Sequence, residues 1–183
     1  MMFHKDTKVA FVLPPKTGTT SLVDCLSVLG FKILPENPIG NNRHALPKEF
    51  LKIYPVLNEY KFYGFFRNPL DRFISLMSMI DNNIKRITLD NYASNLDAHP
   101  KIPPHKQVDW LDYPNTTVFD FDDFREKVSL IGKMYGHAEL KVPKLNIGPQ
   151  RITATDEMKE FVRHYYDADY QFAKRVLGKE YPT

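Results

Sequence analysis

The chain has 183 residues, a net charge of +3 at pH 7, and apolar and charged fractions of 43% and 26% that are ordinary for a globular protein. This length suits one compact domain over residues 1–183, in which any two ligand sites share one core. The single cysteine, Cys25, excludes an internal disulfide, and no Cys/His cluster has the spacing of zinc ligands.

No run of about 20 apolar residues marks a membrane span, and no signal-like segment follows the polar start of the chain. The Lys and Arg residues are scattered, which weakly favours an anionic ligand and gives no sign of nucleic-acid binding. We therefore expect a soluble, unprocessed protein of the reducing cytoplasm with no bound metal. The oligomeric state is not readable from the sequence.

The first pattern along the chain is a strand, a loop and a helix. The apolar run Lys8 to Leu13 predicts a strand buried on both faces of a parallel sheet. The loop over residues 14–21 reads Pro-Pro-Lys-Thr-Gly-Thr-Thr-Ser, and apolar residues then recur at helical spacing until Gly30.

Further strands and helices alternate after this unit. Short strands are expected at 31–34, 60–66 and 116–121, and helices at 48–57, after Asn68-Pro69, at 122–135, and over 153–177 before Gly178. The segment 88–114 is irregular. This alternation predicts a three-layer α/β fold of the P-loop-like kind, in which helices flank a central parallel sheet of about four strands. In such folds ligands bind at the carboxyl ends of the strands.

The loop between the first strand and its helix suits an anion, because the N–H groups at a helix start carry partial positive charge. Gly18 permits close approach of the backbone, and Lys16 adds a mobile charge. Hydroxyl donors come from Thr17, Thr19, Thr20 and Ser21. The NTPase pattern is absent, because Lys16 precedes the glycine and no glycine lies five residues before Gly18. A plain turn with hydroxyl caps is the alternative interpretation.

A second junction follows the strand at 60–66. Arg67 lies at the carboxyl end of that strand and Ser75 lies early in the next helix, so both can reach one anion near the helix start. Alternatively, Arg67 is solvated or paired with Asp71, and Ser75 lies on a helix face.

Taken together, the segments PPKTGTTSL and FRNPLDRFIS resemble those of the PAPS-dependent sulfotransferases, in particular the compact carbohydrate-type branch. PAPS is 3′-phosphoadenosine 5′-phosphosulfate, the sulfonate donor, which leaves as 3′,5′-ADP. The resemblance implies that residues Lys16 to Ser21 bind the 5′-phosphosulfate and that Arg67 and Ser75 bind the 3′-phosphate. Weaker similarity covers residues 104–111, 116–121, Leu145-Asn146 and 166–170.

Sulfonate transfer needs in-line positioning and stabilisation of charge on the leaving oxygen, which we assign to Lys16 without a metal. A base then removes the acceptor proton. His44 is the leading candidate, because its loop resembles the family's histidine segment and histidine titrates near neutrality. His105 competes with it, and Glu36 and Glu49 are alternatives because some sulfotransferases use a carboxylate.

Other interpretations stay open. The chain is either a sulfotransferase acting on a hydroxyl or amine of a carbohydrate, small molecule or peptide, or a non-catalytic nucleotide-binding module of the same fold. An ATP-dependent kinase-like phosphotransferase is disfavoured by the missing glycine, and only Asp120 and Asp122 could substitute for its acidic magnesium strand. The aromatic residues of the final helix are expected to serve helix packing and not to form a ligand cage; they are Tyr165, Tyr166, Tyr170 and Phe172.

Overall fold

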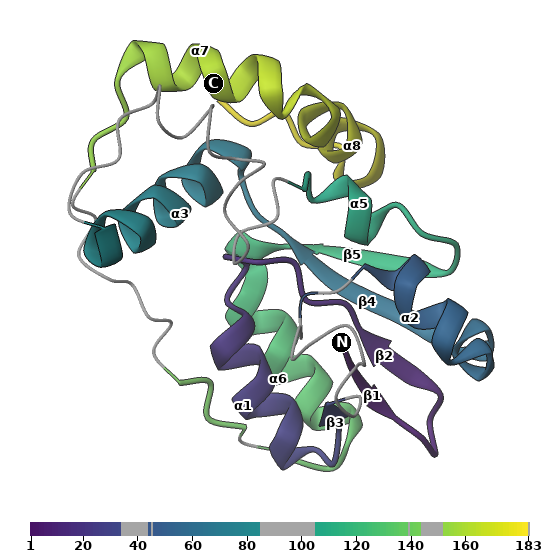
Figure 1. Ribbon diagram of the computed structural model, residues 1–183. Helices are drawn as coiled ribbons and strands as arrows, with labels where there is room; N and C mark the ends of the chain where they lie inside the picture. Colours follow the sequence, from purple (N-terminus) through teal and green to yellow (C-terminus); the bar gives the residue numbers. More distant parts are fainter. Residues whose placement is uncertain (34–43, 45, 85–104, 139, 144–151, 183) are drawn as a thin grey trace. The chain divides into compact units, whose positions relative to one another are not determined.

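The structure is a computed structural model that describes residues 1–33, 44, 46–84, 105–138, 140–143 and 152–182 (Figure 1). The candidate base Glu36 and most of segment 88–114 lie outside these residues. The described chain divides into two compact units, Met1–Arg67 with Asp109–Ile147, and Asn68–Val108 with Gly148–Thr183. The expectation of a single domain over residues 1–183 stays a prediction.

The first unit contains one five-stranded sheet of order β3-β1-β2-β4-β5. Its strands are β1 (Met2–His4), β2 (Val9–Phe11), β3 (Lys32–Ile33), β4 (Lys61–Phe66) and β5 (Thr116–Asp120). β2, β4 and β5 are parallel neighbours, whereas β1 is antiparallel to both β2 and β3. The α/β prediction is therefore confirmed, with a sheet that is parallel at β2, β4 and β5 and mixed overall.

The N-terminal strand β1 was not expected from the polar appearance of the chain start. Met1 and Met2 are nevertheless buried, at 1% and 0% exposure, and Met2 pairs with Phe11 across the sheet. The turn back into β2 contains Lys8 with φ 50°. Three residues are too few to show the alternation that identifies a strand, so residues 2–4 form a strand because they pair with β2.

Two helices cover one face of the sheet (Figure 1). α1 (Thr19–Val28) and α6 (Phe124–Met134) bury Leu26 and Val128 in one apolar cluster with Phe11 of β2 and Phe65 of β4. The first helix and its stop follow the prediction, since α1 ends before Gly30, which has φ 85°.

The short helix α5 (Val108–Leu111) packs against the other face of β4. A Cβ atom at Gly64 would lie 2.4 Å from Leu111 Cδ2 and 2.7 Å from Val12 Cγ2, so only glycine leaves space for this contact. Helices on both faces of the sheet agree with the expected three layers. This unit also contains helix α2 (Pro47–Ile53) and the 3₁₀ helices η1 (Pro55–Glu59) and η2 (Phe121–Asp123).

The second unit is helical. α3 (Pro69–Ile84), α7 (Asp156–Tyr165) and α8 (Asp167–Leu177) pack through a cluster that includes Phe73, Met77, Val162 and Tyr166. Tyr166 and Phe172 are 2% and 3% exposed, which confirms their expected packing role. No described helix has the length and apolarity needed to cross a bilayer.

Two predicted helices are wrong in their continuity. The helix expected at 48–57 breaks into α2 and η1 because Pro55 lacks an N–H group and disfavours helical backbone at Tyr54. The helix expected at 153–177 breaks at Tyr166, which has φ −101° and ψ 22°. No proline or glycine marks this second break, and it places both Tyr166 and Asp169 in the buried interior of the helical unit.

Candidate functional site

The loop between β2 and α1 forms a compact turn at the carboxyl end of β2. Gly18 precedes the helix in left-handed conformation (φ 71°, ψ 20°), and Gly18 O accepts the first helical hydrogen bond from Leu22 N at 3.0 Å. Gly18 has no side chain to cap the helix, and the first turn of α1 has no acidic residue. The helix start therefore presents partial positive charge without a carboxylate of its own.

Two of the threonines in this loop shape it from within. Thr17 Oγ1 and Thr19 Oγ1 donate to Pro14 O at 2.8 and 3.0 Å, and both side chains are buried. Each hydroxyl has one proton, so these protons are used inside the loop. Of the predicted hydroxyl donors to a ligand, Thr20 is exposed at the helix start and Ser21 is buried.

Lys16 adopts a left-handed backbone conformation with φ 68°, which is uncommon for a residue with a side chain. Such conformations persist where the surrounding structure imposes them, and they concentrate at functional sites. Burial lowers the pKa of the Lys16 amine below its usual value of 10.5, and the positive charge of Arg67 lowers it further. Two cations held close together favour an anion between or beside them.

Arg67 reaches the same loop from the neighbouring strand. Its guanidinium donates from NH1 to Lys16 O at 3.1 Å and lies 5.1 Å from the centre of the Phe121 ring. β2 and β4 are parallel neighbours, so residues that follow their carboxyl ends meet at one edge of the sheet. The structure thus brings together Lys16 and Arg67, which are 51 positions apart in the chain.

His44 lies beside this edge. His44 Nδ1 is 2.7 Å from Leu13 O, the residue immediately before the loop, and a carbonyl oxygen can only accept, so Nδ1 carries the proton. In the neutral ring Nε2 is then the basic nitrogen. The carbonyl oxygen of His44 accepts a hydrogen bond from Trp110 Nε1 at 2.8 Å.

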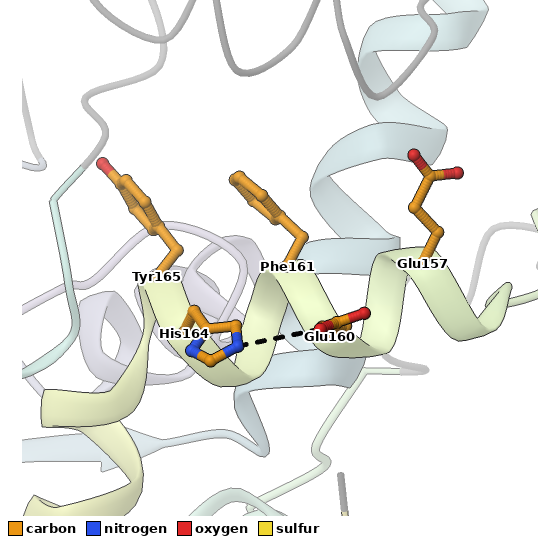
Figure 2. A pocket seen from close by; sticks show the side chains of 5 residues that line it. All are labelled: Glu157, Glu160, Phe161, His164 and Tyr165. Atoms are coloured by element: carbon orange, nitrogen blue, oxygen red, sulfur yellow. Dashed lines mark ion pairs between the residues drawn. The ribbon is translucent and has the colours of Figure 1, made fainter.

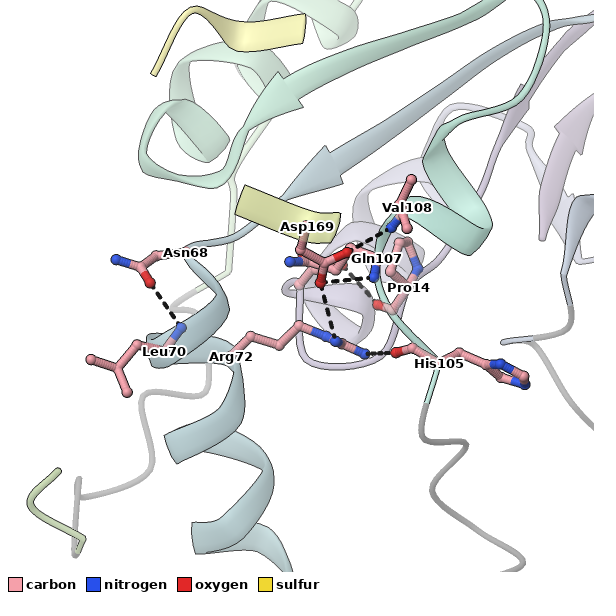
Figure 3. A network of polar contacts seen from close by, with 9 residues as sticks. Pro14, Asn68, Leu70, Arg72, His105, Gln107, Val108 and Asp169 are labelled. Carbon is pink, nitrogen blue, oxygen red and sulfur yellow. Dashed lines mark hydrogen bonds and ion pairs between the residues drawn. The ribbon is translucent and has the colours of Figure 1, made fainter. Parts of the chain in front are cut away.

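Ser75 and His105 belong to the helical unit. Ser75 is half-buried in α3, and His105 O accepts a hydrogen bond from Arg72 NH2 at 3.2 Å. Figure 3 shows the His105 ring directed away from the Arg72 guanidinium. The joint action of Arg67 and Ser75 on one anion stays a prediction.

Sequence reasoning missed a buried polar network in this unit (Figure 3). Arg72 and Asp169 are 3% and 0% exposed, and Arg72 NH1 lies 4.0 Å from Asp169 Oδ2. Asp169 accepts hydrogen bonds from the backbone N–H groups of Gln107 and Val108 at 3.0 and 2.9 Å. Burial raises the pKa of Asp169, whereas Arg72 and the amide donors oppose that rise. Arg72 stands between Asp71 and Phe73 in the sequence, so its immediate neighbours give no sign that it is buried.

Two of the carboxylates considered in the sequence, Glu49 and Asp120, have structural partners. Glu49 Oε2 accepts a hydrogen bond from Leu46 N at 2.9 Å at the start of α2. Asp120 Oδ1 accepts one from Asp122 N at 2.9 Å and caps η2. Within the described part of the chain, no group of three or more His, Cys, Asp or Glu side chains could hold a metal ion.

An open pocket of about 500 Å³ lies along α7 in the helical unit (Figure 2). Phe161 and Tyr165 stack there with ring centres 5.4 Å apart, and His164 Nε2 lies 3.9 Å from Glu160 Oε1. Glu157 completes its lining, and none of the predicted site residues belongs to it.

Comparison with known proteins supports the fold. No protein-family model and no curated protein matches the chain. The chain is similar to the crystal structure of a sulfotransferase from Alicyclobacillus acidocaldarius, with 12% sequence identity and a TM-score of 0.52 over 93% of this chain and 96% of that chain. At this identity the likeness concerns the fold, so the chain has an α/β fold shared with a sulfotransferase of nearly the same length.

Proposed function

We propose that this protein is a sulfotransferase that moves the sulfonate group of PAPS to an acceptor hydroxyl or amine, with a carbohydrate hydroxyl as the first acceptor to test. The observation that carries the proposal is the meeting of Lys16 and Arg67 at the uncapped start of α1. The donor has an anionic group at each end of its ribose, and this edge of the sheet offers cationic groups from two adjacent strands.

Lys16 and the first-turn N–H groups of α1 are assigned to the 5′-phosphosulfate. The lysine and the helix start would both stabilise negative charge as it develops on the leaving phosphate oxygen. Partial burial strengthens this interaction because less water screens the charge.

Arg67 and Ser75 are assigned to the 3′-phosphate. A guanidinium carries five N–H donors, so Arg67 can contact the Lys16 carbonyl and a phosphate together. The Phe121 ring beside the guanidinium supports its orientation.

His44 is assigned as the general base. Its Nδ1–H group is directed to Leu13 O, which sets the tautomer in which Nε2 accepts a proton from the acceptor hydroxyl or amine. As the acceptor oxygen or nitrogen bonds to sulfur, the bond from sulfur to the phosphate oxygen breaks and 3′,5′-ADP leaves. Glu49 fits the base role less well, because its carboxylate caps α2.

Two measurements test the proposal. Thermal unfolding should show stabilisation by 3′,5′-ADP above that by AMP or ATP-magnesium, since a ligand at 100 times its Kd adds about 2.7 kcal/mol. Transfer of labelled sulfonate from PAPS to glycans, tyrosyl peptides and small alcohols then identifies the acceptor. Stabilisation by ATP-magnesium alone would favour a phosphotransferase, and 3′,5′-ADP binding without transfer to any acceptor would favour a binding module.

A further inference from the structure

Trp110 has no role in the function proposed above, although its surroundings are unusual for a residue that only fills space. The indole is 0% exposed in α5, and its Nε1–H group donates to His44 O at 2.8 Å. A buried indole N–H needs an acceptor, and here the acceptor is the backbone of the assigned base.

His44 is thereby held at two points. Its ring is fixed to Leu13 O at 2.7 Å and its backbone carbonyl to Trp110 Nε1 at 2.8 Å. Both holding groups adjoin the sheet, since Leu13 lies two residues after β2 and α5 packs onto Gly64 of β4 through Leu111. With ring and backbone both restrained, the direction of the remaining ring nitrogen is set.

We infer that Trp110 is a positioning residue for sulfonate transfer, acting through the backbone of His44. This inference rests on the proposed function. Trp110 touches neither donor nor acceptor in this assignment, and it keeps Nε2 of His44 in the place from which it removes the acceptor proton. Its loss therefore affects the chemical step and leaves donor binding unchanged, because the donor contacts are assigned to Lys16 and Arg67.

The test compares two substitutions of Trp110. Replacement by β-(3-benzothienyl)alanine keeps the ring shape and removes only the N–H donor, and Trp110→Phe removes the donor and part of the ring. Val128→Ala in α6 is the control, because Val128 is equally buried in the cluster on the other face of the sheet. For each protein we would measure the Kd for 3′,5′-ADP, kcat and KM for PAPS, and the ¹⁵N spectrum of the histidine rings.

In both Trp110 variants kcat should fall about tenfold or more, since small misplacements of a catalytic group have effects of this order or larger. The Kd for 3′,5′-ADP should stay unchanged, and the ¹⁵N signals of the His44 ring, assigned by their absence in His44→Ala, should shift or broaden. Val128→Ala should lower stability and leave kcat and the His44 signals as in the wild type.

Wild-type kcat together with unchanged His44 signals in the benzothienyl variant would overturn the inference. An equal loss of kcat in Val128→Ala would also overturn it, because general destabilisation would then explain the effect. Absence of transfer by the wild-type protein would instead refute the proposed function. The ¹⁵N spectra would still show whether Trp110 holds the His44 ring.

Discussion

The two strand-to-helix junctions of this chain are alike in sequence position and different in construction. After β2, the helix start follows Gly18 and has neither a side-chain cap nor an acidic residue in its first turn. After β4, Asn68 Oδ1 accepts from Leu70 N at 2.9 Å, Pro69 opens α3, and Asp71 lies in its first turn. The N–H groups at the first helix start are thus open to an anion, whereas at the second a side-chain cap accepts a hydrogen bond from one N–H group and proline removes another.

This difference teaches which parts of each junction can serve a ligand. At the first junction the backbone and Lys16 can both contribute. At the second, Asn68 occupies one of the first-turn donors and Asp71 adds negative charge, so the helix start is a poor anion site. What this junction offers a ligand in the proposed assignment is the side chains of Arg67, which donates a hydrogen bond to Lys16 O, and of Ser75.

The largest effect is expected for His44→Ala, because the first junction is assigned the chemistry and His44 is bonded to Leu13. Donor binding should persist while turnover falls by about 10² to 10⁴. The wild-type rate should rise with pH as the imidazole loses its proton, and this limb should vanish in the variant. Steady-state rates at saturating PAPS, measured over a range of pH, give the turnover and its pH dependence.

His105→Ala is the rival variant and should keep the pH limb. Turnover that survives in His44→Ala and collapses in His105→Ala would transfer the base role to His105. Turnover that survives in both would direct the search to Glu36 and Glu49.

Lys16→Ala should reduce turnover by a free-energy difference of about 2.7 to 4 kcal/mol, since one preorganised charge donor to the transition state is lost. Stability should change little, because the residue lies in a loop. Lys8→Ala is a matched control, as Lys8 also has positive φ and pairs with Glu59 far along the chain. Near wild-type turnover of PAPS by Lys16→Ala would show that the charge comes from another residue.

Arg67→Ala should weaken the binding of 3′,5′-ADP by about 1.5 to 3 kcal/mol, the value of a charge-assisted hydrogen bond. The binding of AMP should stay nearly unchanged. Ser75→Ala should act in the same direction with a smaller loss, because a neutral hydroxyl contributes less. Titration calorimetry with both nucleotides gives the two differences. Equal weakening of both nucleotides would contradict the assignment of the 3′-phosphate.

High pH should weaken donor binding through Lys16. Its lowered pKa means that the charge is lost as pH rises through a value below 10.5, and above that value affinity should fall about tenfold per pH unit. Without ligand, the free energy of unfolding should rise with pH over the same window. The unfolded chain still holds the proton there, whereas the folded chain has released it. Both slopes should be reduced in Lys16→Met, and identical slopes in the two proteins would exclude Lys16 as their source.

The smallest effect is expected for Asn68→Ala, which removes the cap of α3. The free energy of unfolding should fall by about 1 kcal/mol, and 3′,5′-ADP affinity should stay as in the wild type. Thr155→Ala is the matched variant, since Thr155 Oγ1 accepts from Met158 N at the start of α7. Urea unfolding measures the stability of both variants, and calorimetry measures their affinity for 3′,5′-ADP. Loss of nucleotide affinity in Asn68→Ala alone would show that the second helix start binds the ligand after all.

Local patterns in the sequence were sufficient where the cause of a structure is local. The apolar run of β2, the glycine stop of α1, the Asn68-Pro69 start of α3 and the loop at 14–21 all depend on neighbouring residues. The same holds for the placement of Lys16 and Arg67 at strand ends, because parallel strands that alternate with helices put their carboxyl ends at one edge.

Tertiary contacts decided what neighbouring residues could not. Pairing with β2 made a strand of Met2–His4, and burial of Tyr166 and Asp169 accompanies the break between α7 and α8 without any breaking residue. The sequence identified Arg67 and His44 as candidates, but their partners follow from the fold. Arg67 bonds to Lys16 O, and His44 bonds to Leu13 O and to Trp110. Hydrogen bonds between residues far apart in the chain leave no periodic trace, because each partner is supplied by a different element and only folding brings the two within 3 Å or so of each other.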